Sequence, residues 1–223
     1  STQLARKLAE HGVSPASVLR HGGLPAGLFD QEKILVSTDE LFALYRGIEG
    51  ASDDAAIGLK LGTEPRVERY DPIAMTAVSA RSLRDALERL ARYKQLTCPE
   101  ELQVKERGDE CRVRFRWLLA QETEPPVLID LCFAWVVGIA RRGTGDLVNS
   151  KRLELRGPTR DPRMYEAHFG CPARFEGREN TIVFAKADLD RPFVTHRRHG
   201  AGGPLPGAPA EAGRALSGDA VSN

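Results

Sequence analysis

Two structural signals meet in residues 101–140, which have the sequence ELQVKERGDECRVRFRWLLAQETEPPVLIDLCFAWVVGIA. In the first part, Leu102 and Val104 alternate with charged or polar residues up to a turn at Gly108-Asp109. After the turn, four apolar residues alternate with three arginines: Cys111, Val113, Phe115 and Trp117 with Arg112, Arg114 and Arg116. Such alternation is typical of half-buried strands, and a Gly-Asp turn between two of them indicates a hairpin. The sequence predicts a β-hairpin with one apolar, aromatic face and one cationic face.

The second part of this stretch predicts a helix that is buried on nearly every side. Apolar residues dominate Val127–Ala140, where Asp130 is the only charged residue, and Pro125-Pro126 precedes the run. The run is too short to cross a bilayer, and a helix that is apolar all round belongs in the core of a domain. We therefore expect this helix to be the central element of the fold.

The residues that follow complete a mixed domain. Leu153 and Leu155 indicate a third strand, Asp161-Pro162 begins a helix, and Thr181–Phe184 indicates a fourth strand. The order from about residue 98 to 196 is β-β-α-β-α-β, which predicts a small antiparallel sheet packed on helices. Together with a helical N-terminal part over about residues 1–97, the fold class is α+β.

The helical N-terminal part is predicted from helix caps and from apolar residues at the helical period. Ser14-Pro15 opens one helix, Ser37 or Thr38 caps another, and Ser82 with Asp85 begins a third. In the third helix the apolar residues recur every three or four positions, at Leu83, Ala86, Leu87, Leu90 and Ala91. A brief strand is expected over Ile34–Val36.

The composition changes at residue 197. Residues 197–223 are rich in glycine, alanine and proline and lack apolar periodicity, a composition that cannot form a packed core. We expect residues 1–196 to form the folded unit and residues 197–223 to form a flexible, disordered tail.

Charge and cysteine usage exclude some classes of protein. The formal net charge is +1, whereas a free-standing DNA-binding protein usually carries a basic surplus. The four cysteines contain no Cys-x-x-Cys pair, and the first ten residues do not resemble a signal peptide. The sequence therefore favours free thiols in a reducing cytoplasm, and no membrane association is expected.

Several segments, taken in order, resemble one family. Phe169-Gly170-Cys171-Pro172-Ala173-Arg174-Phe175 is followed by Asn180-Thr181-Ile182-Val183-Phe184 and by Leu189-Asp190-Arg191-Pro192. These segments resemble the end of the N-terminal, arabinose-binding-like domain of AraC-type transcription regulators. Leu83–Tyr93 is similar to the central helix of that domain, and Ile57–Gly62 also fits. The resemblance covers about residues 10–196.

The resemblance implies a cytoplasmic sensor that binds a small-molecule effector and forms a homodimer. In the family, a C-terminal domain with two helix-turn-helix motifs binds DNA. Here the residues after Thr195-His196 depart from that plan, so the DNA-binding domain is expected to be absent from residues 197–223. DNA would then be a partner only through a domain outside these residues.

A sensor needs a concave, mostly apolar pocket with a few polar groups. The residues that we predict to bind the ligand are mainly aromatic, because rings give a large contact area at a small entropic cost. They are Tyr70, Met75, Arg92, Tyr93, Phe115, Trp117, Phe133 and Trp135. Arg92, like Arg69, could hold a ligand carboxylate through a two-pronged pair. Each of these residues could instead be ordinary core or surface.

Catalytic and metal-binding motifs are missing from the sequence. There is no phosphate-binding glycine loop, no Gly-x-Ser-x-Gly motif and no His-Glu-x-x-His motif. His168 and Cys171 have a metal-like spacing, but zinc needs four ligands and no second pair is nearby. We expect no cofactor, no metal and no enzymatic activity.

Two questions stay open at the level of the sequence. The chain could act instead as a stand-alone truncated regulator that forms mixed dimers with a full-length protein, and an uncatalogued enzyme is a third hypothesis. The row Arg112, Arg114 and Arg116 could be a solvated strand face, or it could meet acidic residues of a second subunit or of the absent domain.

Overall fold

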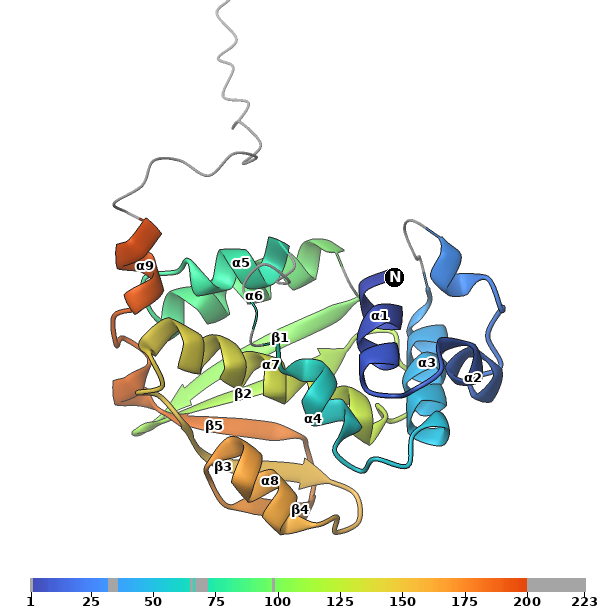
Figure 1. Cartoon of the computed structure of the whole chain (residues 1–223). Coiled ribbons are helices and arrows are strands. Elements are labelled where there is room, and N and C mark those ends of the chain that lie inside the picture. Colours follow the sequence, from blue (N-terminus) through green and yellow to red (C-terminus); the bar gives the residue numbers. More distant parts are fainter. Residues whose placement is uncertain (1, 32–35, 65, 67–71, 98, 200–223) are drawn as a thin grey trace, which may run out of the picture.

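The computed structural model describes residues 2–31, 36–64, 66, 72–97 and 99–199, and it contains the predicted hairpin at one side of a sheet (Figure 1). The hairpin consists of β1 (Glu100–Arg107) and β2 (Glu110–Trp117), joined at Gly108, whose φ is +62°. The antiparallel register sets Leu102 opposite Phe115. Both side chains are buried, as the alternation of the sequence predicts.

The sheet has five strands in the order β1-β2-β5-β3-β4. The three strands after the hairpin are β3 (Ser150–Arg156), β4 (Ala173–Gly177) and β5 (Thr181–Ala185). The α+β class is confirmed, but the expected antiparallel sheet is in fact mixed, because β3 and β4 run parallel. Strand β4 was not predicted, since it lies at the edge of the sheet and none of its residues is fully buried.

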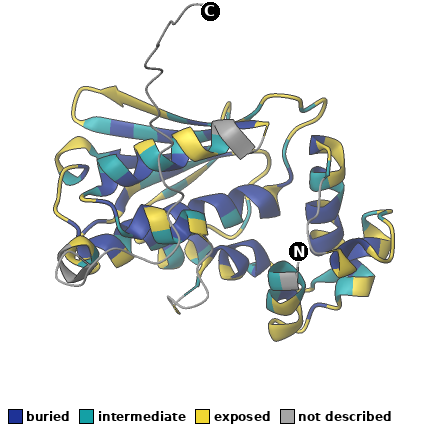
Figure 2. Cartoon of the chain, turned by 90° about the horizontal axis from the view of Figure 1, so that it is seen from above, coloured by how far each residue is buried: buried dark blue, intermediate teal, exposed yellow. Residues whose placement is uncertain are grey.

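Helix α7 (Pro126–Thr144) is the predicted central helix, and Figure 2 shows it buried along most of its length. It packs on the apolar face of the sheet, where the rings of Phe133 and Phe115 lie 6.2 Å apart between centroids. On its other side lies the short helix α4 (Ile57–Gly62). The two backbones approach closely, because a Cβ atom at Gly62 would lie only 2.3 Å from the Leu131 carbonyl oxygen.

The N-terminal part is helical, as the caps predict. Its elements are α1 (Thr2–Glu10), α2 (Pro15–His21), the 3-10 turn η1 (Leu28–Asp30) and α3 (Thr38–Ala51). Ser37 begins α3 in a reciprocal capping box, in which its hydroxyl accepts from Glu40 N and the Glu40 carboxylate accepts from Ser37 N. The expected strand at Ile34–Val36 falls largely outside the described residues, and Val36 itself has no regular structure.

Two helices connect this part to the hairpin. They are α5 (Pro72–Val78) and α6 (Leu83–Thr97), and α6 packs against β1. At the start of α6 the Ser82 hydroxyl accepts a hydrogen bond from Asp85 N at 3.3 Å, as the predicted cap requires. The Asp85 carboxylate accepts from Arg81 N at 2.9 Å, which completes the N-terminal turn of the helix.

The last described elements return to the core. After α8 (Pro162–Phe169) and β5 come the 3-10 turn η3 (Lys186–Asp188) and α9 (Val194–His199). Phe193 is buried against Gly143 of α7, and its N–H donates to the Arg81 carbonyl oxygen at 2.8 Å. Helix α9 continues three residues beyond the expected boundary at 196, and the expected tail falls outside the described residues from residue 200 onward. No helix in the described part of the chain is long and apolar enough to cross a membrane.

Candidate functional site

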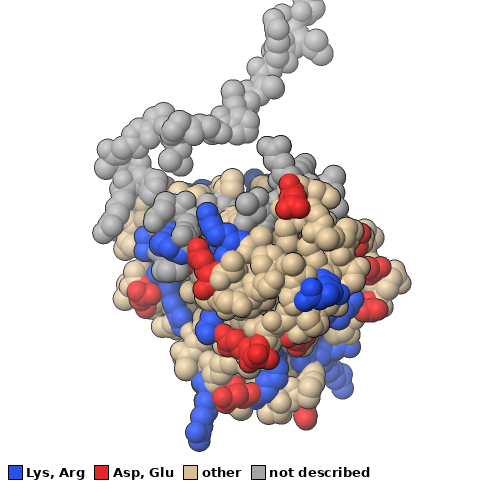
Figure 3. All heavy atoms as spheres, turned by 45° about the vertical axis from the view of Figure 1, so that its right-hand side comes forward, with Lys and Arg blue, Asp and Glu red and all other residues tan. Residues whose placement is uncertain are grey.

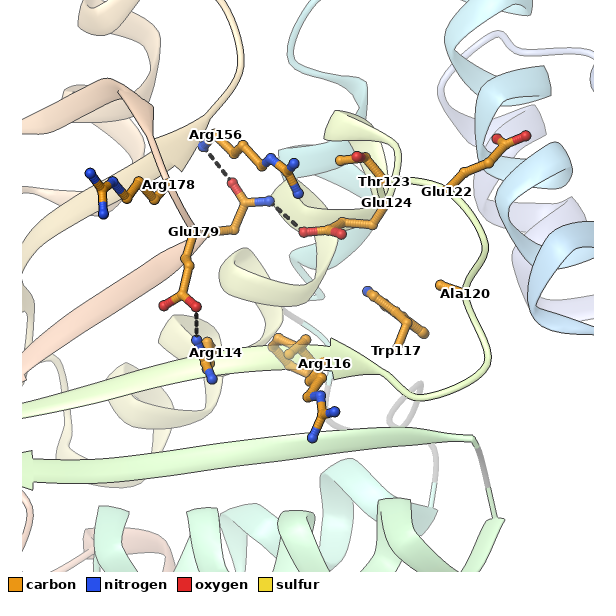
Figure 4. Close-up of a pocket in the computed structure, with 12 residues that line it drawn as sticks. Arg114, Arg116, Trp117, Ala120, Glu122, Thr123, Glu124, Arg156, Arg178 and Glu179 are labelled. Atoms are coloured by element: carbon orange, nitrogen blue, oxygen red, sulfur yellow. Dashed lines mark hydrogen bonds and ion pairs between the residues drawn. The ribbon is translucent and has the colours of Figure 1, made fainter.

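A cleft opens where strand β2 extends beyond its pairing with β5. That pairing ends at Val113 with Ile182, whereas β2 continues to Trp117. The turn between β4 and β5, the end of β3 and the loop before α7 surround the space beside this free end (Figure 4). We call it the β2–β5 cleft; its volume is about 310 Å³. Its lining consists of Arg114, Phe115, Arg116, Trp117, Ala120, Glu122, Thr123, Glu124, Arg156, Arg178, Glu179 and Asn180.

Asn180 ties the walls of the β2–β5 cleft together. Its amide nitrogen donates to a Glu124 carboxylate oxygen at 2.7 Å, and its side-chain oxygen accepts from Arg156 N at 2.7 Å. One side chain therefore links the loop before α7 to the end of β3. These two hydrogen bonds fix the shape of the cleft, because they hold the loop and the strand end in place relative to each other.

The arginine row on β2 pairs with acidic residues of the same chain. Arg112 forms an ion pair with Glu154, and Arg114 forms one with Glu179, which is visible in Figure 4. Arg116 lies 3.7 Å from a Glu101 carboxylate oxygen. The Arg112 and Arg116 side chains are still 40% and 62% exposed, so the solvated strand face predicted as one alternative exists alongside these ion pairs. A contact of this row with a second subunit stays a prediction. The acids come from β1, from β3 and from the turn before β5, a relation that the pattern of a single strand cannot reveal.

Behind the hairpin wall lies an aromatic cluster, which consists of Phe42, Phe115, Trp117, Phe133 and Trp135. Phe42 meets Trp117 edge to face at 5.5 Å between ring centroids, and Phe115 meets Phe133 at 6.2 Å. Such pairs add stabilisation beyond that of the buried area. Phe115 and Trp117, which are members of this cluster, also line the β2–β5 cleft.

A buried ion pair lies beside the aromatic cluster. Lys94 of α6 pairs with Glu100 of β1, whose side chain is only 3% exposed. The Lys94 Nζ atom also lies 6.0 Å from the Phe115 ring centroid and 5.8 Å from that of Trp135. A cation between ring faces is attracted by their negative π surfaces, which adds to its attraction to the carboxylate. The charges of Lys94 and Glu100 thus satisfy each other within an apolar wall.

The titratable groups next to this ion pair are held in their neutral forms. Burial raises the pKa of the Tyr45 hydroxyl, and the negative charge of Glu100 raises it further. Burial also raises the pKa of the Cys132 thiol, and the Glu100 carboxylate adds to that effect. A thiol nucleophile needs a lowered pKa, so Cys132 is inert packing rather than a reactive group.

A second buried carboxylate, which lies outside the β2–β5 cleft and outside the aromatic cluster, has a structural role. Asp130 of α7 accepts a hydrogen bond from Tyr165 Oη at 2.8 Å and pairs with Arg160 at 2.8 Å. Burial raises the pKa of Asp130, while the charge of Arg160 opposes that change. These contacts fasten α8 to α7, and they explain the one charged residue in the apolar run of the central helix.

His168 and Cys171 do not point to a metal. The Cys171 Sγ atom lies 3.2 Å from Ser150 Oγ, and burial raises the pKa of its thiol. The His168 ring packs edge to face on Phe169 at 4.8 Å. No group of three or more potential ligands, among histidine, cysteine, aspartate and glutamate, is close enough to hold a metal ion within the residues that the structure describes.

The structure brings together half of the residues predicted to bind a ligand. Phe115 and Trp135 lie beside the Lys94 ammonium, and Phe133 contacts the Phe115 ring. Trp117 lines the cleft together with Phe115. Met75 packs against the core from α5, while Arg92 and Tyr93 are exposed on α6, and none of these three lines the cleft. Tyr70, like Arg69, falls outside the described residues.

Sequence reasoning missed the polar half of the cleft. Arg156, Arg178 and Asn180 come from the end of one strand and from a turn, and no periodicity marks them. Glu122–Glu124 come from the loop that precedes α7. The only available signal was Asn180 itself, in the segment that carries the family resemblance.

Comparison with known proteins identifies the family. The model of the arabinose-binding domain at the N-terminus of AraC transcription regulators matches residues 12–193. The chain belongs to this family of transcription regulators. The resemblance noted in the sequence is therefore confirmed, and the β2–β5 cleft and the aromatic cluster lie inside the matched domain. The chain is a regulatory sensing domain of the AraC type.

Individual relatives agree with this assignment. The chain is 30% identical over 106 residues to uncharacterised HTH-type transcriptional regulators of Mycobacterium bovis and Mycobacterium tuberculosis, a match that covers 47% of this chain and 31% of each relative. The crystal structure of the transcriptional regulator CdpR from Pseudomonas aeruginosa has a TM-score of 0.58 at 21% identity, which shows a shared fold. That match covers 86% of this chain and 56% of CdpR, so the chain spans about half of the solved regulator.

Proposed function

We propose that this domain binds a small organic metabolite as its effector and passes the signal to a DNA-binding domain outside the described residues. It acts in the cytoplasm as a homodimer and catalyses no reaction. The proposal rests on one observation: a cleft of about 310 Å³ has an aromatic wall inside an AraC-type sensing domain. That volume is at the lower end of ligand pockets, roughly 300–1,000 Å³, and therefore suits a metabolite of few atoms.

The predicted aromatic residues take two roles in this proposal. Phe115 and Trp117 contact the effector across the β2–β5 cleft, because both line it. Phe133 and Trp135 lie behind them and keep the wall rigid. Met75, Arg92 and Tyr93 do not line this cleft, so they are not assigned to it.

The charge distribution supports a sensor rather than a direct DNA-binding surface. Figure 3 shows basic and acidic side chains interspersed on the visible face, with no broad surface of one sign. The net charge of the chain is +1. Binding to the phosphate backbone requires an excess of cations, so DNA contacts belong to another domain.

The two tryptophans of the chain, Trp117 and Trp135, provide a direct test. A metabolite library is screened by thermal shift, because a ligand that binds the native state raises the melting temperature. In Trp135→Phe, Trp117 is the sole indole reporter, and a genuine effector must change its fluorescence with a hyperbolic dose response. A hit that stabilises the protein but leaves Trp117 emission unchanged binds elsewhere and contradicts the proposed site.

Dimerisation is tested separately by light scattering at tens of micromolar, a range set by weak-interface affinities. A two-fold sensor suits paired DNA half-sites. A mass of one chain at that concentration, with and without a ligand found in the screen, would contradict the homodimer.

A further inference from the structure

Among the charged side chains that line the β2–β5 cleft, those without a partner in the described part of the chain are cations. Each of its three carboxylates has a partner: Glu179 has Arg114, Glu124 has Asn180, and Glu122 has Arg46 at 2.9 Å. By contrast, Arg156 and Arg178 form no side-chain ion pair with the rest of the described chain. Both side chains are exposed, so a ligand from solution can reach them. A surplus of unpaired guanidinium groups along the cleft favours a ligand that brings its own negative charge.

A buried indole N–H adds a third free donor. Trp117 Nε1 is shielded from water and has no hydrogen-bond acceptor among the described residues. A buried donor without a partner costs about 1–3 kcal/mol, so such groups are rare unless an acceptor arrives from outside. An acceptor atom of a bound molecule would remove that cost.

The orientation of the side chains distinguishes the two free arginines. In Figure 4 the Arg156 side chain turns towards Thr123 and Glu124, across the cleft, whereas Arg178 turns away. The backbone N–H of Arg156 is held by Asn180 at 2.7 Å, which fixes the base of the side chain. Arg156 is therefore the guanidinium that reaches a molecule in the cleft.

We propose that the β2–β5 cleft binds a small organic acid through its anionic oxygens, with Arg156 as the principal partner and Trp117 Nε1 as a second donor. The planar guanidinium matches a carboxylate or a phosphate ester with two parallel hydrogen bonds. The rings of Phe115 and Trp117 pack against the carbon skeleton of the ligand. This inference rests on the proposed sensing function and adds the chemical class of the effector.

The test compares oxyanions with uncharged analogues, and in the two acid–amide pairs the compounds have nearly the same shape. Calorimetric titration of the protein uses benzoate against benzamide, succinate against succinamide, and glycerol 3-phosphate against glycerol. We expect at least one oxyanion to bind with a saturable isotherm and its uncharged partner to bind at least 10-fold more weakly. The carboxylate and phosphate compounds distinguish the two sources of oxyanion. If sodium sulfate at the same ionic strength bound as tightly as the organic oxyanion, the effect would be a general anion effect, and the proposal would be overturned.

Variants then assign the binding to the cleft. Arg156→Gln removes the charge, and we expect it to weaken binding of the oxyanion by about 10- to 100-fold. Trp117→Phe keeps a ring but removes the N–H, which should weaken binding by about 3- to 10-fold. The matched control is Arg163→Gln, an exposed arginine of α8 outside the cleft, which should leave binding unchanged. Circular dichroism of each variant verifies that it is folded.

Two outcomes separate this inference from the proposed function. If only uncharged metabolites bind and change Trp117 fluorescence, the domain is still a sensor and the organic-acid proposal is wrong. If an oxyanion binds but Arg156→Gln and Arg163→Gln bind it equally well, the assignment to Arg156 is wrong. Failure of every compound in both screens would overturn the inference together with the sensing function.

Discussion

Replacing Gly62 with alanine tests whether the close contact between α4 and the central helix sets the stability of the domain. A Cβ atom at Gly62 would lie 2.3 Å from the Leu131 carbonyl oxygen and 2.7 Å from the Ala134 Cβ atom. Ordinary contacts of this kind begin at 3.4 Å. Both obstacles belong to the buried helix α7, so no flexible side chain can move aside.

The expected cost follows from this overlap. To accommodate the methyl group, α4 must move away from α7 by about 1 Å, which disrupts close packing along the shared face. Overpacking of a well-packed core costs about 1–3 kcal/mol. For a chain of 223 residues, each kcal/mol lowers the melting temperature by roughly 2–4 °C, so Gly62→Ala should melt roughly 2–12 °C below the parent.

The matched control is the same substitution in α7. A Cβ atom at Gly138 would meet nothing within 4 Å, and alanine in a helix is favoured over glycine by about 0.5–1 kcal/mol. Gly138→Ala should therefore raise the stability while Gly62→Ala lowers it. Urea unfolding followed by circular dichroism measures both. Equal or greater stability of Gly62→Ala, with an unchanged dependence on urea, would refute the argument that the two backbones are in contact.

Three further predictions concern charge and burial. The hydrogen bond from Arg152 lowers the pKa of Glu110 to about 2, so the stability that this carboxylate contributes is full above pH 4.5 and is lost as the pH falls towards 2. A carbon-detected NMR titration should find this pKa, and Arg152→Gln should return it towards 4.5. Burial lowers the pKa of His168, so the unfolded chain binds a proton at a higher pH than the folded chain, and the stability falls as the pH drops below 6.5. The urea midpoints at pH 7.5 and 5.5 should therefore differ less in His168→Phe than in the parent. Phe193→Ala should lower the free energy of unfolding by about 3–5 kcal/mol, because the Phe193 side chain is 1% exposed, whereas Val194→Ala, at a neighbouring residue that is 44% exposed, should change it by less than about 0.5 kcal/mol. A similar loss for both variants in urea unfolding would contradict the buried position of Phe193.

The elements that sequence reasoning recovered are those with a local physical cause. The hairpin follows from the alternation of Val113 and Phe115 with arginines, and α7 follows from a run that is apolar on every side. The capping box at Ser37 and the cap at Ser82 fix the starts of two helices, because the side chain satisfies the first free N–H groups. Each of these signals is complete within one element, so it can be identified without knowing what the element packs against.

Strand β4 was missed because its environment, rather than its sequence, makes it a strand. Its side chains alternate only between half-buried and exposed, and it pairs with β3 alone, in parallel, after the crossover through α8. An edge strand with no buried face has no apolar period to detect. The same limit applied to the row of arginines on β2, whose acidic partners come from strands and turns far away in the sequence.

The β2–β5 cleft extends this reasoning to the site itself. Prediction favoured aromatic residues, and two of them, Phe115 and Trp117, do form a wall of the cleft. The donors opposite them lie at the end of β3 and in the turn before β5, where the chain has left its regular period. Periodic residues build walls because burial selects them, whereas the groups that distinguish one ligand from another lie where strands end and pairing leaves a gap. In the proposed sensing role, the choice of ligand depends on residues such as Arg156, which lies beside the part of β2 that extends beyond its pairing with β5.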